Sequence, residues 1–297
     1  MKKIKILVIG ATGMLGNAQF TELTKYANFD VYGTVRKSEE LVNHMPPQFV
    51  KKIFSGVDIE RIESITEIME KVKPNIVLNC VGLIKQAPTA SNVALEIYMN
   101  ALFPHKLAMI CQKFNARMIH FSTDCVFNGE KGDYKETDPS DAYDVYGKTK
   151  YLGEVTYDNC LTIRTSIIGH GLEAHASLID WFLSQKGTIK GYNKVIYSGL
   201  PTIEIARIIA EFIIPNKDMK GLYQVTAEPI SKYDLLKLVS KVYSKNITIE
   251  PFNGEVSDRS MNSSRFRKET GYMPPSWPEL IHRMYEYYKS NPNFIKY

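Results

Sequence analysis

Ile4-Lys-Ile-Leu-Val-Ile9-Gly10-Ala-Thr-Gly13-Met-Leu-Gly16 opens this 297-residue chain with an apolar run, three spaced glycines and the start of a mixed segment. The apolar run predicts a strand, and the polar and apolar residues after Gly16 predict a helix. Without side chains, Gly10 and Gly13 let the backbone approach a pyrophosphate, whose charge the helix N-terminus favours. The alternative is an ordinary glycine-rich turn. On the first interpretation, the turn binds a dinucleotide through Gly10, Thr12, Gly13, Met14, Leu15 and Gly16.

Short apolar runs recur along the first half of the chain and predict further strands. They lie at Val31–Val35, Phe49–Phe54, Ile76–Val81, Met118–Ser122 and Leu161–Ile163. Stretches of helical length separate several of these runs, and strands that alternate with helices indicate parallel βαβ units. The sequence therefore predicts an α/β fold with a Rossmann-type, doubly wound parallel sheet.

The pattern changes beyond Arg164, where the periodic segments predict helices broken by Pro and Gly. The candidates are Ser177–Gln185, Ile203–Ile213, Lys232–Tyr243 and Trp277–Lys289. We expect residues 1–165 to form a dinucleotide-binding domain. Residues 166–297 are expected to form mainly a smaller substrate-binding lobe, partly packed back on the sheet, with a loose tail at 291–297.

The composition is typical of a folded, soluble protein, with 44% apolar and 23% charged residues. No apolar run reaches the roughly 18 to 20 residues of a membrane span, so we expect a cytoplasmic location. The four cysteines show no C-x-x-C spacing, which predicts reduced thiols and no metal site. The net charge of +5 comes from scattered Lys and Arg, which disfavours a nucleic-acid partner and is compatible with an anionic ligand.

A cationic pair, Arg36-Lys37, follows the second predicted strand, where a fold that prefers NAD places an acidic residue. The guanidinium of Arg36 suits a 2′-phosphate, so we predict NADP(H); the alternative is an exposed basic loop. Asp58 follows the third predicted strand, where it could meet the adenine amino group or cap a helix. We expect the same cofactor to be lined by Ile59 and by Cys80, Val81 and Gly82 after the fourth strand.

Tyr146 and Lys150 lie four residues apart, so on a helix both side chains share one face. A neighbouring ammonium lowers the pKa of the Tyr146 phenol and helps it pass a proton to a carbonyl oxygen as hydride reaches the carbon. Thr123, at a predicted strand end, could hydrogen-bond that oxygen or merely cap the next helix. A lone Y-x-x-x-K pattern is common, and its position 130 residues after Gly16 is what favours catalysis.

With these residues in place, nearly the whole chain resembles the extended short-chain dehydrogenase/reductases, and within them the dTDP-4-dehydrorhamnose reductase group. The resemblance rests on Gly10-x-x-Gly13-x-x-Gly16, Asn79-Cys-Val-Gly82, Asn100, Ser122-Thr123-Asp124-Cys-Val-Phe127-Asn-Gly129, Tyr134-x-Glu136-Thr-Asp138-Pro139, Tyr146-Gly-Lys-Thr-Lys150 and Arg164-Thr165-Ser166. It implies NADPH-dependent reduction of the 4-keto group of a nucleotide-linked 4-keto-6-deoxyhexose, for rhamnose-type sugars of surface polysaccharide. It also implies catalysis by Thr123, Tyr146 and Lys150, and substrate contacts from Lys85, Asn100, Thr123, Asp124 and Arg259.

Two positions suggest a different member of this superfamily. Cys125 stands where the rhamnose reductases commonly have Tyr, and it is similar to the Cys of the bifunctional epimerase/reductases that make GDP-fucose or UDP-rhamnose. His170 resembles the histidine of GDP-fucose synthase, offset by one residue. An alternative function is therefore a 3,5-epimerase/4-reductase in which Cys125 and His170 move protons. The plainer interpretation is a packing cysteine and a hydrogen-bonded loop histidine.

Two further alternatives stay open. A nucleotide-sugar dehydratase or 4-epimerase on this scaffold would keep NAD as a resident cofactor, and Arg36 argues against that. A non-catalytic NADP-binding regulatory subunit could lose Tyr146 or Lys150, so the presence of both favours an enzyme. We expect a nucleotide-sugar substrate as partner. The aromatic segment 284–288 could mark a homodimer face or pack on its own core.

Overall fold

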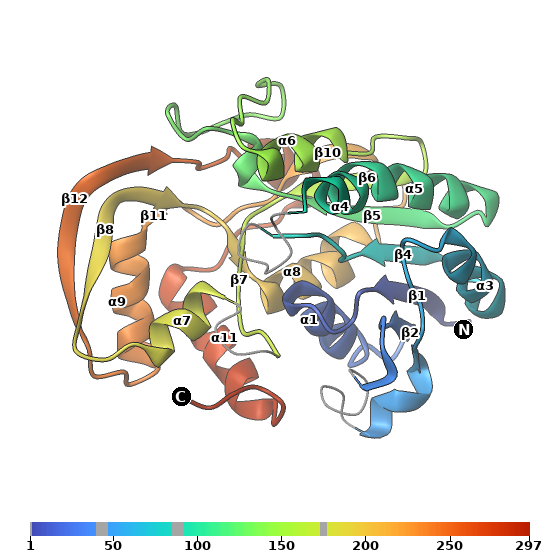
Figure 1. Cartoon of the computed structure of the whole chain (residues 1–297), viewed down its shortest axis with the longest axis horizontal. Helices are drawn as coiled ribbons and strands as arrows, with labels where there is room; N and C mark the ends of the chain where they lie inside the picture. Colours follow the sequence, from blue (N-terminus) through green and yellow to red (C-terminus); the bar gives the residue numbers. More distant parts are fainter. Residues whose placement is uncertain (1, 40–46, 85–91, 173–176) are drawn as a thin grey trace.

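The computed structural model describes residues 2–39, 47–84, 92–172 and 177–297, and its centre is a seven-stranded sheet (Figure 1). The strands follow the order β10-β6-β5-β4-β1-β2-β3, and all neighbours are parallel. The strands are β1 Ile4–Ile9, β2 Phe29–Thr34, β3 Ile53–Phe54, β4 Ile76–Asn79, β5 Arg117–Ser122, β6 Cys160–Arg164 and β10 Gly221–Gln224. The order reverses between β1 and β4, which opens a crevice at their carboxyl ends. The predicted α/β, Rossmann-type fold is confirmed.

Helices cover both faces of this sheet. They are α1 Met14–Leu23, α3 Ile62–Val72, α5 Phe103–Lys113, α8 Thr202–Ile208 and α11 Trp277–Ser290. Ile6 and Val8 of β1 share one hydrophobic core with α1, α8 and α11, whereas Leu7 and Ile9 share another with α3 and α5. Successive strand residues point to opposite faces, so both faces are buried. This explains why the strands are nearly continuous apolar runs in the sequence.

The chain after β6 builds a lobe at the left of Figure 1. A three-stranded sheet of order β11-β8-β12 and a two-stranded sheet of β7 and β9 form it. Its elements are β7 Ile167–Ile168, α7 Leu178–Ser184, β8 Thr188–Tyr197, β9 Leu200–Pro201, β11 Ile230–Ser231, α9 Lys232–Val242 and β12 Thr248–Asp258, whereas α10 Ser264–Thr270 contacts β10 of the main sheet. β10, α8 and α11 belong to the same half of the chain but pack on the main sheet. The boundary at residues 165/166 stays a prediction.

Two predictions about single segments are wrong. Most of Phe49–Phe54 is not a strand but part of a 3-10 helix, Pro47–Lys52, and only Ile53–Phe54 pairs with β2. The ring of Phe49 packs edge-on against Phe20 of α1, with ring centroids 5.4 Å apart, which holds the helical turn against the sheet layer. The tail at 291–297 is docked rather than loose, because Phe294 is 3% exposed and lies in an aromatic cluster with Tyr287 and Tyr288.

No helix in the described part of the chain is both long enough and apolar enough to span a membrane. Cytoplasmic location and dimerisation stay predictions from the sequence.

Candidate active site

The glycine turn after β1 is shaped by the lack of side chains. Gly10 has a φ of +84°, which glycine adopts without strain. A Cβ on Gly16 would lie 2.0 Å from the carbonyl oxygen of Gly10, so only glycine lets α1 start this close to the turn. Gly13 is the N-cap of α1 and has no side chain to bond the first helical N–H groups. Those N–H groups have no partner within the helix and can meet a phosphate.

The end of β2 is tied to this turn. The hydroxyl of Thr34 accepts from the Gly10 N–H at 3.2 Å, and the Thr34 carbonyl accepts from Ala11 N–H at 2.9 Å. Arg36 follows two residues later with an exposed side chain, as does Lys37. This places the predicted cationic pair at the same edge of the sheet as the glycine turn.

Asp58 lies at that edge as well, because the Val57 N–H donates to the carbonyl of Val35. Its carboxylate accepts from the Glu60 N–H at 3.0 Å and stabilises a local turn before α3. The carbonyl of Ile59 accepts from the Tyr98 hydroxyl at 2.7 Å. The predicted adenine contacts of Asp58 and Ile59 stay untested.

The segment after β4 connects the glycine turn to the predicted catalytic residues. A Cβ on Gly10 would lie 2.9 Å from the Val81 side chain, and the Cys80 N–H donates to Ile9. A Cβ on Gly82 would lie 3.4 Å from the Asn100 amide oxygen and 3.8 Å from Lys150 Nζ. Cys80, Val81 and Gly82 therefore run from the turn towards Lys150.

Asn100 supports this segment rather than facing a ligand. The side chain is fully buried, its oxygen accepts from the Leu83 N–H at 2.9 Å, and its nitrogen donates to the Leu83 carbonyl at 2.9 Å. Both amide atoms bond to the backbone, which gives Asn100 a positioning role, and its predicted substrate contact stays untested. Lys85, the other predicted substrate contact nearby, lies outside the described residues.

The structure brings Thr123, Tyr146 and Lys150 together at the carboxyl end of β5. α6 (Val145–Leu152) starts at Asp144, whose carboxylate accepts from the Gly147 N–H at 2.8 Å. A Cβ on Gly147 would lie 2.2 Å from the Cys125 carbonyl oxygen, so glycine lets α6 approach the residues after β5. The Tyr146 phenol hydrogen-bonds the Thr123 side chain, and Lys150 Nζ donates to the carbonyl of Phe121 at 2.7 Å.

The pKa of Tyr146 differs from the prediction that Lys150 lowers it. Burial, reinforced by the nearby Cys125 thiol, raises the pKa of Tyr146, and the bond to Thr123 opposes that shift. Burial lowers the pKa of Lys150 to about 8, and the carboxylate of Glu154 opposes that shift. Burial therefore outweighs the predicted lowering of the phenol pKa by Lys150. The phenol keeps its proton at neutral pH, which suits a proton donor.

A buried ion pair between Arg164 and Glu154 lies next to the end of β5 and bonds to Ser122 there. Arg164 Nε and Nη2 donate to the two carboxylate oxygens of Glu154 at 2.6 and 2.7 Å, and Ser122 Oγ donates to the same carboxylate at 2.7 Å. The two charged side chains are only 2% and 6% exposed. The sequence analysis gave Glu154 no role, because it lies after the end of α6 and only the fold brings it to Arg164.

Cys125 and His170 lie in different surroundings. Cys125 is half-buried beside Tyr146, within the 3-10 turn Asp124–Val126. His170 is 2% exposed, with Nδ1 2.7 Å from Asp180 and Nε2 2.8 Å from the Tyr243 hydroxyl. Both ring nitrogens are occupied by residues of the C-terminal lobe. These bonds fit the plainer interpretation, a hydrogen-bonded loop histidine, and the predicted acid/base role of His170 stays untested.

The C-terminal lobe reaches the site through the end of β12. Arg259 Nε donates to the Phe127 carbonyl at 2.9 Å, and the Asp258 N–H donates to Gly129. Asp124 is 9% exposed, and its charge contributes to the raised pKa of Tyr197 on β8, so this phenol lies within electrostatic reach of Asp124. Sequence reasoning missed Tyr197, because only the folded lobe brings it there. The predicted substrate contacts of Asp124 and Arg259 stay untested.

Within residues 2–39, 47–84, 92–172 and 177–297, no cluster of three His, Cys, Asp or Glu side chains could hold a metal ion.

Comparison with known proteins places the chain in a family. Residues 4–290 match the model of the RmlD substrate binding domain. The chain is 26% identical to a dTDP-4-dehydrorhamnose reductase of Aggregatibacter actinomycetemcomitans over 95% of this chain and 99% of that protein. It is 24% identical to the spore coat polysaccharide biosynthesis protein SpsK of Bacillus subtilis over 93% of this chain and 95% of that protein.

Among solved structures, the dTDP-4-dehydrorhamnose reductase of Bacillus anthracis, in complex with NADP, superposes with a TM-score of 0.79. It is 19% identical to this chain and covers 97% of it, and 99% of that structure is matched. A family model that spans almost the whole chain shows that the protein belongs to the RmlD substrate binding domain family.

Proposed function

We propose that this protein uses NADPH to reduce the 4-keto group of a nucleotide-linked 4-keto-6-deoxyhexose. The observation that carries the proposal is the meeting of Thr123, Tyr146 and Lys150 at the carboxyl end of β5, with Gly82 next to Lys150. Family membership and the similarity to dTDP-4-dehydrorhamnose reductases support the same reaction class. The name of the similar SpsK protein supports a place in polysaccharide biosynthesis.

The crevice fits a dinucleotide. Gly10 and Gly16 leave the space that a Cβ would fill, and the first turn of α1 offers N–H groups to a pyrophosphate. Arg36 and Lys37 would hold a 2′-phosphate beside that turn. Bound there, NADPH supplies the hydride that is added to the carbonyl carbon.

The residues of this chain then control the proton. Tyr146 donates its phenolic proton to the carbonyl oxygen. The hydroxyl of Thr123 now donates to Asp124 at 3.1 Å and can instead donate to the substrate oxygen. The charge of Lys150, held near the end of β5, favours loss of the proton from Tyr146. The sugar nucleotide would lie between this strand end and Arg259.

The decisive experiment is turnover with a panel of dTDP-, UDP- and GDP-linked 4-keto-6-deoxy sugars. NADPH absorbance follows reduction, and mass analysis of products formed in deuterated water follows exchange at carbons 3 and 5. Reduction without deuterium at those carbons is the expected result. Deuterium that disappears in Cys125→Ser would instead establish an epimerase/reductase. Tight NADPH binding without turnover of any substrate would contradict the proposal and favour a regulatory subunit.

Cofactor choice gives a second test. Arg36→Ala should weaken NADPH binding roughly tenfold while NADH binding changes little, because only NADPH carries the 2′-phosphate. Titration of both cofactors measures the two dissociation constants, and Lys113→Ala, an exposed change on α5, is the control. An equal loss for both cofactors would show that Arg36 does not contact the 2′-phosphate.

A further inference from the structure

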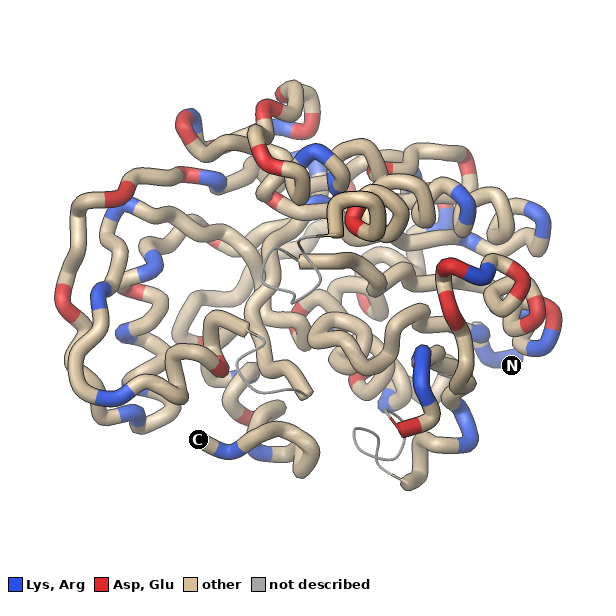
Figure 2. Tube along the Cα trace, in the orientation of Figure 1, with Lys and Arg blue, Asp and Glu red and all other residues tan. Residues whose placement is uncertain are grey.

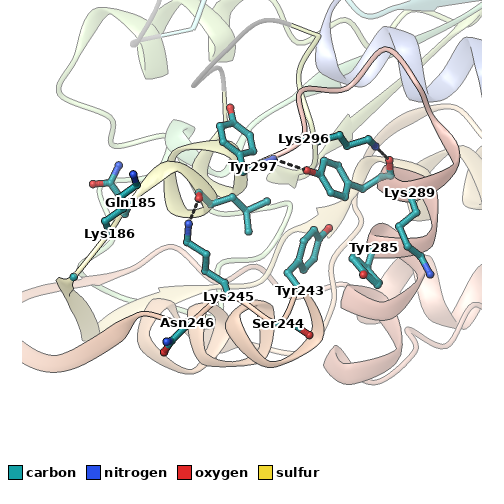
Figure 3. Close-up of a pocket in the computed structure, with 13 residues that line it drawn as sticks. Gln185, Lys186, Tyr243, Ser244, Lys245, Asn246, Tyr285, Lys289, Lys296 and Tyr297 are labelled. Carbon is teal, nitrogen blue, oxygen red and sulfur yellow. Dashed lines mark hydrogen bonds between the residues drawn. The ribbon is translucent and has the colours of Figure 1, made fainter.

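A cavity of about 430 Å³ lies in the C-terminal lobe, away from the candidate active site (Figure 3). It is formed where the end of α7, the end of α9 and the end of α11 meet the last residues of the chain. None of the thirteen lining residues is a predicted catalytic or cofactor residue. In Figure 1 this region lies beside the C-terminus at the lower left, whereas β5 and α6 lie in the upper part. The volume falls in the range of small-molecule sites.

The lining of the cavity is strongly cationic. Lys186, Lys245, Lys289 and Lys296 line it, and no Asp or Glu is among the lining residues. Only Lys289 has a carboxylate partner in the described ion pairs, Glu286 at 2.8 Å. Figure 2 shows Lys and Arg segments next to the C-terminus. Ammonium groups that line a concave surface without carboxylate side chains attract an anion to it.

Two of these ammonium groups are held in place by backbone oxygens and retain donors. Lys245 Nζ donates to the carbonyl of Leu183, and Lys296 Nζ donates to the carbonyl of Tyr288 (Figure 3). Lys296 Nζ also donates to the carbonyl of Asn291. An ammonium has three N–H donors, so each keeps at least one for a ligand. Burial lowers the pKa of Lys296, and a bound anion would counter that shift.

Aromatic rings form the other part of the lining. Tyr243 and Tyr285 meet edge to face with ring centroids 4.7 Å apart, and Lys289 Nζ lies 4.7 Å from the Tyr285 centroid. Lys296 Nζ lies 4.0 Å from the Tyr288 centroid. Phenol rings beside ammonium groups suit a ligand that carries both a flat ring and a negative charge.

His170 fixes the floor of this cavity. Its Nε2 bonds the Tyr243 hydroxyl, and its ring stacks on Tyr288 at a centroid distance of 4.3 Å. Asp180 holds the opposite nitrogen at 2.7 Å. The two tyrosines are thus positioned before any ligand arrives, which reduces the ordering cost of binding.

We propose that this lysine and tyrosine cavity binds a small organic phosphate, with the phosphate against the lysines of the lining and a flat ring against Tyr243 and Tyr285. The site goes beyond the proposed function and does not depend on it, because it shares no residue with the reductase site. Lysine commonly binds phosphate through a compact charged ammonium group. Unlike the guanidinium of arginine, this group does not require the two parallel hydrogen bonds of a bidentate contact. A nucleoside monophosphate satisfies both requirements.

The test is a fluorine NMR titration of protein labelled with 3-fluorotyrosine, with uridine monophosphate as the probe and saturating NADP+ present. Tyr243→Phe and Tyr285→Phe assign the two signals of the cavity. We expect both signals to shift on titration, and we expect inorganic phosphate to bind more weakly because it has no ring. The doubly substituted Lys186→Met/Lys296→Met protein should bind the probe at least tenfold more weakly.

The matched control is the double substitution Lys190→Met/Lys237→Met, which removes two exposed lysines of the same lobe. Each of these also lies over an aromatic ring, at 4.5 Å from Phe252 and 5.1 Å from Tyr233. An equal loss of affinity in both proteins would show only general attraction and would overturn the proposal. Unshifted signals for Tyr243 and Tyr285, or equal affinity for sulfate, would overturn it as well. If Lys296→Met disturbs folding, Lys186→Met alone, at an exposed position, replaces the double substitution and should also weaken binding of the probe.

Discussion

Two buried polar networks lie on either side of this molecule, and both contain a residue that the sequence presents as a catalytic acid or base. At the carboxyl end of β5, Lys150 donates to Phe121 and retains further donors, and Tyr146 lies one helical turn before it on α6. In the C-terminal lobe, both ring nitrogens of His170 are occupied by Asp180 and Tyr243. We therefore expect unused hydrogen-bonding capacity at a cleft to be a better guide to catalysis than residue type alone.

The strongest test of this difference is Tyr146→Phe. Removing the phenolic proton should lower kcat by about 10²- to 10⁴-fold, because a positioned general acid contributes that much. NADPH binding should stay the same, since the ring is retained. Steady-state turnover with the accepted sugar nucleotide, together with cofactor titration, measures both quantities.

Tyr151→Phe is the matched control, because Tyr151 is the next tyrosine of α6 and is 43% exposed. Its kcat should equal that of the unchanged protein. If Tyr146→Phe kept full turnover, Tyr146 would not be the proton donor and the first network would lose its catalytic role.

We expect the Arg164–Glu154 ion pair to affect the free energy of unfolding more than it affects kcat. Arg164→Met leaves the carboxylate of Glu154 buried without its partner and should lower the free energy of unfolding by about 3–5 kcal/mol. The doubly substituted Glu154→Met/Arg164→Met protein removes both charges and should recover much of that loss. Urea unfolding measures the free energy of unfolding of the unchanged protein, Arg164→Met and the double substitution.

If the double substitution were as unstable as Arg164→Met, the burial of an unpaired charge would not be the cause. Its turnover is informative too, since Ser122 Oγ loses the acceptor that holds it next to Thr123. We expect a lower kcat in this stable protein, and an unchanged kcat would limit the pair to a folding role.

In contrast to Tyr146→Phe, His170→Phe should lower the stability and leave kcat nearly unchanged. The ring can keep its contact with Tyr288, but the bonds to Asp180 and Tyr243 are lost, at a cost of about 1–3 kcal/mol in unfolding free energy. We expect kcat to stay within a factor of about two, since no proton transfer depends on this residue. His282→Phe, at an exposed position of α11, is the control. A large loss of kcat with retained stability would restore His170 as a catalytic candidate.

Much of the first half of the fold could be predicted from the sequence, because β1, β4, β5 and β6 are largely buried and stand out as apolar runs. The glycine turn was equally clear, since Gly10 and Gly16 are required by local geometry. Tyr146 and Lys150 were found because a helix fixes their separation. In each case a short stretch of chain determines the structure.

The rest depends on contacts between distant segments. β8 and β12 were missed because most of their residues are not fully buried, so they show no clear apolar pattern. The docking of Phe294 and the partners of His170 come from α7, α9 and α11 together. The raised pKa of Tyr146 follows from burial, which no spacing in the sequence reports.

The smallest effect we expect is a pH dependence that only the first network should show. Lys150 has a pKa of about 8, below the 10.5 of a free side chain, so it is charged below about pH 8 and neutral above. One unit above that value roughly a tenth of the protein is charged, and kcat/KM should fall about tenfold. Stability should respond in the opposite direction. Between about pH 8 and 10.5 the unfolded chain binds a proton that the folded chain lacks, so the contribution of Lys150 to the unfolding free energy rises with pH.

Lys150→Met should remove both responses, and the difference from the unchanged protein isolates Lys150 from other groups. That subtraction matters because the buried thiols of Cys80 and Cys111 have raised pKa values and lower the stability over part of the same range. His170→Phe should keep both responses, since His170 lies in the other network. An alkaline fall in kcat/KM that persists in the residual activity of Lys150→Met would assign the titration to a different group, and the contrast between the two networks would then rest on Tyr146 alone.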